Sequence, residues 1–91
     1  MASVQVIVSG RVQGVYFRDF TSRQATELSL TGYVRNLRDR NAVEVVAEGE
    51  RSHLEKLIDY VKVGPPAAIV DKVDTKWSAF TGSYSEFSIR Y

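Results

Sequence analysis

The sequence contains no cysteine, a single histidine and almost no excess of charge of either sign. Without cysteine the chain forms no disulfide bond and offers no thiolate nucleophile, which suits a reducing compartment. A net charge of +1 is too balanced for a protein that mainly binds nucleic acid or an anionic membrane, so we expect neither partner. The histidine, His53, falls at a predicted helix start, and we expect it to face solvent and bind no metal.

Long apolar runs and linker-like stretches are also missing. No apolar segment approaches the roughly 20 residues that a membrane-spanning helix needs, and the first ten residues lack the basic start of a signal peptide. No stretch rich in proline, glycine or serine divides the 91 residues, whose number is close to the size of one compact domain. We therefore expect residues 1–91 to form a single domain, cytoplasmic and, because no apolar patch is evident, a monomer.

The arginines are unevenly distributed. Residues 1–41 carry six arginines against three acidic residues, whereas residues 42–91 carry six basic and eight acidic residues. The first half of the chain is therefore suited to binding a small anion, although arginines on a solvated face explain the excess equally well.

Two hydrophobic periodicities alternate along the chain. A period of two, rich in β-branched residues, predicts five strands, over residues 4–10, 33–37, 42–49, 68–78 and 87–91. Helical spacing of apolar residues predicts a first helix from Phe17 to Leu28, closed by Thr31-Gly32. It predicts a second helix from Ser52, which forms a capping box with Glu55, to a stop at Gly64-Pro65-Pro66.

The resulting order is βαββαβ followed by a short extra C-terminal strand. Because strand–helix–strand connections are right-handed, both helices should fall on one face of a mainly antiparallel sheet. We therefore predict an α+β fold, an α/β sandwich of the ferredoxin-like type.

The segment from Gly10 to Arg18 joins the first strand to the first helix. Free N–H groups at a helix start and the positive end of the helix dipole favour an anion there, and Gly14 lets the backbone turn its amides inward. Arg18 adds a planar charged fork that binds two oxygens at once. An ordinary strand–helix turn with a solvated arginine is the alternative that spacing alone leaves open, whereas a Walker A loop is excluded because no Gly-Lys-Ser/Thr follows.

The whole string GRVQGVYFRDF, from Gly10 to Phe20, resembles the signature of the acylphosphatases, whose phosphate loop reads G-R-V-Q-G-V-x-F-R. Residues 32–37 (GYVRNL) are similar to the second motif of that family, G-x-V-x-N, and residues 43–49 (VEVVAEG) to the strand that follows it. Residues 64–67 (GPPA) and 87–91 (FSIRY) also match, so the similarity covers nearly the full chain.

The resemblance implies a hydrolase that cleaves small acyl phosphates to a carboxylate and inorganic phosphate, by in-line attack of water and without a metal or other cofactor. It assigns phosphate binding to Arg18 and orientation of the water to Asn36. It also implies phosphate contacts from the loop N–H groups of Gln13, Gly14, Val15, Tyr16 and Phe17. An asparagine that bonds its own backbone at a strand end is the alternative for Asn36.

Three positions depart from the family pattern or extend it. The turn from Asp39 to Ala42 is one residue longer than usual, and we expect Asn41 to take the left-handed conformation that a glycine supplies there. Tyr16 stands where glycine is common, and we expect it to narrow the pocket and alter substrate preference. We also hypothesise that the terminal carboxylate of Tyr91 approaches Arg18 and orients it.

Two other functions fit the same element order. One is a non-catalytic anion-binding module of the kind that is attached to larger enzymes. The other is an RNA-binding βαββαβ domain, but residues 42–49 (AVEVVAEG) contain none of the aromatic residues that such a domain presents on its sheet.

Overall fold

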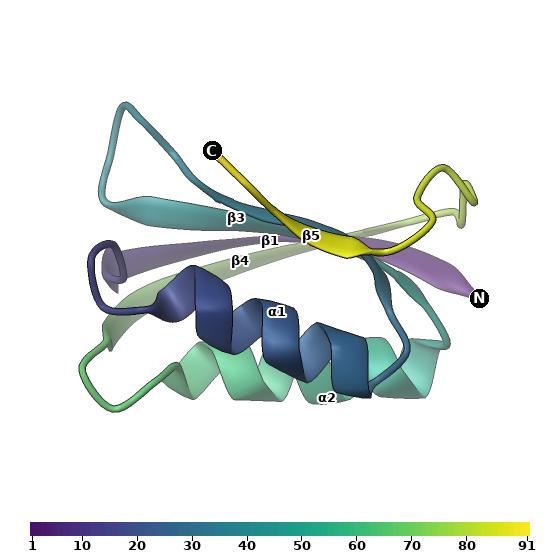
Figure 1. The fold of residues 1–91 in the computed structure, drawn as a ribbon, viewed down its shortest axis with the longest axis horizontal. Coiled ribbons are helices and arrows are strands. Elements are labelled where there is room, and N and C mark those ends of the chain that lie inside the picture. Colours follow the sequence, from purple (N-terminus) through teal and green to yellow (C-terminus); the bar gives the residue numbers. More distant parts are fainter.

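The computed structural model describes all 91 residues as one five-stranded sheet covered on one face by two helices, as Figure 1 shows. Along the chain the elements are β1 (Ala2–Arg11), α1 (Phe17–Glu27), β2 (Thr31–Asn36), β3 (Ala42–Gly49), α2 (Arg51–Val63), β4 (Ile69–Ser78) and β5 (Phe87–Arg90). The strand order is β4-β1-β3-β2-β5; only β2 and β5 pair in parallel. The predicted fold class and the mainly antiparallel sheet are confirmed.

The core lies between the sheet and the helices. Val4, Val6 and Val8 of β1 are fully buried, because alternate side chains of a strand point to the same face. Leu54 and Leu57 of α2 are fully buried against the same cluster of 17 apolar residues. Burying a side chain of this size stabilises the fold by about 1.5–3 kcal/mol. The core thus holds both helices against the sheet.

The predicted capping box at Ser52 is wrong. The helix α2 begins at Arg51, and Glu50, the one residue between β3 and the helix, is its N-cap residue without a side-chain capping bond. The N–H groups of His53 and Leu54 donate instead to the Glu50 carbonyl, at 3.1 and 3.0 Å. Ser52 is therefore already inside the first turn, where its hydroxyl cannot act as a cap.

The end of α1 also differs from the prediction. The helix ends at Glu27, and Ser29 takes a left-handed conformation with φ of 58°. Thr31 and Gly32 do not close the helix but begin β2. Gly32 has φ of 134°, and a Cβ there would lie 1.9 Å from the carbonyl oxygen of Val46 on β3. This glycine therefore allows two strands to approach closely.

In the turn between β2 and β3, Asn41 is not left-handed, contrary to our expectation. Its carbonyl instead accepts a hydrogen bond of 3.0 Å from the N–H of Gly10. The turn is thus attached to the end of β1, where the loop to α1 begins.

Neither helix is long and apolar enough to cross a membrane.

Candidate active site

The loop between β1 and α1 contains two left-handed residues. Gly14 has φ of 73° and Tyr16 has φ of 63°, whereas Val15 between them has a negative φ. Alternation of this kind turns successive N–H groups toward one side and forms a concave anion site. A non-glycine residue in the left-handed region is unusual, and Tyr16, which is 81% exposed, gains no burial in return.

The N–H groups from Gln13 to Phe17 have no acceptor within the protein, whereas the N–H of Val12 donates to the Gly10 carbonyl at 3.0 Å. The first helical hydrogen bond of α1 runs from the N–H of Phe20 to the carbonyl of Tyr16, at 3.0 Å. No N–H from Gln13 to Phe17 donates to a backbone carbonyl or to a side chain. These are the five groups that the family resemblance assigns to phosphate. Together with the start of the helix they provide unpaired donors of the kind that bind anions.

The side chain of Gln13 attaches this loop to the turn between β2 and β3. Its Nε2 donates to the carbonyls of Leu37, Ala42 and Arg40, at 2.8, 2.9 and 3.1 Å. Sequence reasoning assigned only the backbone N–H of Gln13 and missed this contact. The one available signal was a long polar side chain between the two glycines of the loop.

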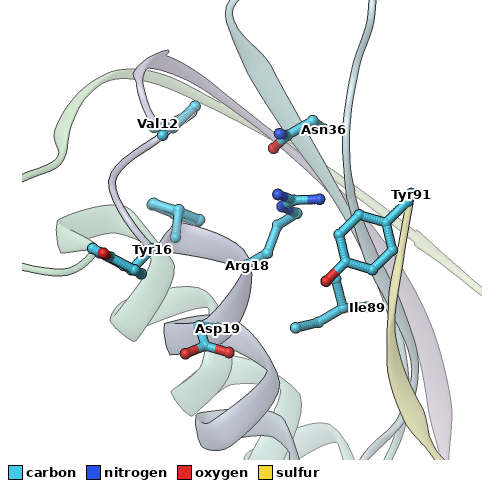
Figure 2. A pocket seen from close by; sticks show the side chains of 9 residues that line it. Val12, Tyr16, Arg18, Asp19, Asn36, Ile89 and Tyr91 are labelled. Carbon is cyan, nitrogen blue, oxygen red and sulfur yellow. The ribbon is translucent and has the colours of Figure 1, made fainter.

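Arg18 and Asn36 come from different elements and line the same cavity, which has a volume of about 460 Å³. Figure 2 shows the Arg18 side chain rising from the first turn of α1 toward Asn36, the last residue of β2. The other residues that line the cavity are Val12, Gly14, Tyr16, Phe17, Asp19, Ile89 and Tyr91. Five of the seven predicted site residues thus line one cavity, whereas Gln13 and Val15 do not.

Arg18 forms no ion pair and donates no hydrogen bond to a protein group. Its guanidinium carbon lies 4.8 Å from the centre of the Tyr91 ring, as a cation–π contact. The ring, and not the terminal carboxylate of our hypothesis, is the part of Tyr91 that meets Arg18. The guanidinium is therefore held by an aromatic face, while its N–H donors stay available to a ligand.

The side chain of Asn36 also lacks a protein partner. Its Oδ1 is buried and accepts no hydrogen bond. A buried acceptor without a partner is rare, because its desolvation costs about 1–3 kcal/mol. The alternative in which Asn36 bonds its own backbone has no support in the structure, since no such bond forms.

A second cavity, of about 490 Å³, adjoins the first and shares Asn36 and Tyr91 with it. Its lining contains Arg35, Arg38 and Arg90 and no acidic residue. Arg35 and Arg90 are neighbours in the β2–β5 register, on the sheet face opposite the helices. The end of the sheet is thus electropositive on the side of Asn36 that faces away from Arg18.

One carboxylate beneath these arginines is paired. The Nε of Arg35 donates to Glu44 on β3 at 2.6 Å, and Gln5 and Tyr33 donate to the same carboxylate at 2.7 and 3.1 Å. Burial acts to raise the pKa of Glu44, but the three hydrogen bonds together hold it below its usual value. Glu44 therefore compensates Arg35, and Arg90 stacks on the Tyr33 ring at 4.0 Å without an acidic partner.

Comparison with known proteins agrees with this site. The acylphosphatase family model matches residues 4–89. The chain belongs to the acylphosphatase family. It is 50% identical over 91 residues to an acylphosphatase of Dehalococcoides mccartyi strain CBDB1, with complete coverage of both chains. The crystal structure of the acylphosphatase from Bacillus subtilis superposes with a TM-score of 0.94 at 37% identity, again with complete coverage of both chains. The protein is thus an acylphosphatase, a hydrolase of acid anhydrides.

The acylphosphatase fold also occurs inside longer chains. A structure of full-length HypF in a phosphate- and nucleotide-bound form matches with a TM-score of 0.85 and 27% identity, over 99% of this chain and 12% of that one. The full-length matches above are to proteins named as acylphosphatases, which favours the enzyme over the attached module. The described residues contain no group of three or more histidine or acidic side chains placed to hold a metal ion.

Proposed function

We propose that this acylphosphatase hydrolyses small acyl phosphates by direct in-line attack of water on phosphorus. The N–H groups of Gln13 to Phe17 and the guanidinium of Arg18 hold the phosphoryl oxygens, and Asn36 holds the water. The new bond joins the water oxygen to phosphorus, and the bond that breaks joins phosphorus to the carboxylate oxygen. The products are a carboxylate and inorganic phosphate, which takes the protons of the water.

The chemistry explains why so few groups suffice. A carboxylate is a good leaving group, so the reaction needs little help from a general acid. The transition state of phosphoryl transfer carries its charge mainly on the three equatorial oxygens, which N–H donors and a guanidinium stabilise. Asn36 binds a water through its amide without becoming a nucleophile itself.

One observation carries the proposal. Five loop N–H groups, the Arg18 guanidinium and the Asn36 Oδ1 all lack partners within the protein, and all belong to residues at the same end of the sheet. Unsatisfied polar groups are normally scattered and few, so their concentration at one end of the sheet points to a ligand with acceptor oxygens on one side and a water on the other.

The decisive experiment is the hydrolysis of benzoyl phosphate, in the presence of a chelator, by single-residue variants. Arg18→Ala should lower kcat/KM by on the order of a thousandfold or more, and Asn36→Ala should abolish most turnover. Arg18→Lys should also fail, because an ammonium group cannot replace the planar fork. Arg23→Ala, which removes an exposed arginine one turn and a half further along α1, is the matched control and should keep wild-type activity.

Near-wild-type turnover of either alanine variant at the catalytic positions would refute this mechanism. Phosphate-dependent stabilisation of the wild-type protein without any turnover would instead identify an anion-binding module. A phosphate monoester measured beside benzoyl phosphate tests whether the substrate must be an acyl phosphate.

We also propose that residues 1–91 act as one domain, as a monomer in the cytoplasm, with no metal or cofactor. The single sheet and the single apolar cluster support the one domain. Light scattering of the purified protein tests the monomer, cell fractionation tests the location, and an undiminished rate after dialysis against a chelator tests the independence from metals.

A further inference from the structure

The direction of water attack determines where the acyl group of the substrate lies, if the mechanism proposed above is correct. In-line displacement places the entering and leaving oxygens on opposite sides of phosphorus. Asn36 brings the water from the β2 side of the cavity, so the acyl group leaves on the side away from Asn36. The arginines of the second cavity lie beyond Asn36 and are therefore not on the path of the acyl group.

The side of the cavity away from Asn36 carries a carboxylate. In Figure 2, Asp19 lies on the opposite side of Arg18 from Asn36. Asp19 lines the cavity, is exposed and forms no ion pair. An acidic residue in the first turn of a helix favours the helix dipole, but that effect does not require the side chain to line a cavity. The Asp19 carboxylate is thus an uncompensated negative charge beside the expected path of the acyl group.

We propose that Asp19 makes this enzyme discriminate against acyl groups that carry a second negative charge. Neutral acyl groups are the preferred substrates, in a cavity that is also lined by Ile89 and Tyr16. The proposal concerns the acyl part of the substrate alone. Repulsion of the phosphoryl group by Asp19 acts equally on every acyl phosphate, so it cancels in a ratio of two substrates.

A rigid pair of substrates measures this discrimination. Benzoyl phosphate and 4-carboxybenzoyl phosphate differ by one para carboxylate, which lies far from the phosphorus. The quantity to compare is the ratio of kcat/KM for the carboxylated substrate to kcat/KM for benzoyl phosphate. We treat the para carboxylate and the Asp19 carboxylate as two unit charges about 7 Å apart in a medium with an effective dielectric constant of about 40–80. Coulomb's law then predicts that Asp19→Asn raises this ratio about three- to eightfold.

Three further measurements identify the source of the change. Asp19→Glu should keep the ratio near the wild-type value, and Asp59→Asn, the same substitution on the exposed face of α2, should leave it unchanged. The effect of Asp19→Asn should shrink in about 0.5 M salt, because screening weakens interactions between exposed charges.

An unchanged ratio in Asp19→Asn would overturn the proposal. So would a several-fold fall of the ratio in Arg38→Gln with no rise in Asp19→Asn, since that result places the para carboxylate among the arginines beyond Asn36. An unchanged ratio alone leaves the proposed mechanism intact, because that mechanism is tested separately by the turnover of Arg18→Ala and Asn36→Ala. The Arg38→Gln result would also contradict the side from which Asn36 is proposed to deliver the water. A loss of stability in Asp19→Asn lowers both rates alike and does not affect the ratio.

Discussion

The Gln13 side chain offers the sharpest test of how this site is built, because it touches no substrate and yet holds the phosphate loop. Gln13→Ala removes the only side chain that connects the loop to the turn between β2 and β3 through hydrogen bonds. Gln13→Glu keeps the length and volume of the side chain but replaces the donor by a carboxylate, which cannot donate to carbonyl groups when ionised. The two variants therefore separate lost volume from lost hydrogen bonds.

The expected magnitude follows from the three contacts. The Nε2 carries two hydrogens, so the carbonyls at 2.8, 2.9 and 3.1 Å share two donors. At about 0.5–1.5 kcal/mol for each hydrogen bond, Gln13→Ala should lower the free energy of unfolding by about 1–3 kcal/mol. A released loop moves its N–H groups relative to Asn36, and a displacement of about 1 Å is enough to lower kcat/KM by up to about a hundredfold.

Two assays on the same preparations decide the matter. Urea unfolding gives the free energy of unfolding, and benzoyl phosphate hydrolysis at a temperature where each variant is fully folded gives kcat/KM. We expect Gln13→Glu to lose at least as much activity as Gln13→Ala. The control is Gln24→Ala, which should lose little activity because the Gln24 side chain on α1 makes no hydrogen bond. The reasoning fails if Gln13→Glu keeps wild-type activity, because the loop would then hold its shape without the donors.

Two further predictions concern stability. The pKa values of Glu44 and Glu48 are held below the usual 4.5, because hydrogen bonds to each carboxylate outweigh the burial that would raise them. A depressed pKa in the folded state adds stability that is present above the unfolded pKa and is lost as pH falls through the folded pKa. The free energy of unfolding should therefore fall steeply below about pH 4.5. It should fall less steeply in Glu48→Gln, which lacks one of the two carboxylates. Urea unfolding at pH 7, 5 and 3.5 measures this, and equal slopes for the two proteins would contradict it. Gly32→Ala should lower the free energy of unfolding by about 3 kcal/mol or more, because its Cβ meets the Val46 carbonyl oxygen at 1.9 Å. Gly14→Ala, where a Cβ has free space, should cost only about 1–2 kcal/mol for its left-handed backbone, and equal losses for the two glycines would refute this account.

Much of the fold was predictable because periodicity reports which side of an element is buried. The alternation in β1 matches the burial of Val4, Val6 and Val8, and the bounds of β3 agree with the prediction. The helix ends were not predictable in the same way. Ser52 is a residue type that often caps a helix, but the position of the cap depends on the residue at which β3 ends. In the same way, a glycine such as Gly32 is as compatible with a helix end as with a close contact between strands.

The site, too, has features that the sequence predicts and features that depend on the tertiary structure. The glycines and Arg18 could be placed at the start of a helix from sequence spacing, and the family resemblance assigned Asn36. The Tyr91 ring beside Arg18 and the side-chain contacts of Gln13 depend on which strands are neighbours. Their positions follow from the parallel pairing of β2 with β5 and from the attachment of the β2–β3 turn to the loop. Neither contact can be predicted from local periodicity.

These contacts explain how a site with so few reactive groups keeps its geometry. The phosphate loop follows β1, whereas Asn36 ends β2, and β3 separates the two strands in the sheet. The turn between β2 and β3 spans that gap, since its carbonyls receive the Gln13 side chain and the N–H of Gly10. In the proposed mechanism, the same small set of hydrogen bonds therefore sets the distance from the phosphoryl group to the water. The groups that we propose as catalytic have no protein partners, so their positions depend on these neighbouring contacts. For that reason the Gln13 side chain should matter to the rate although it does not reach the reacting atoms.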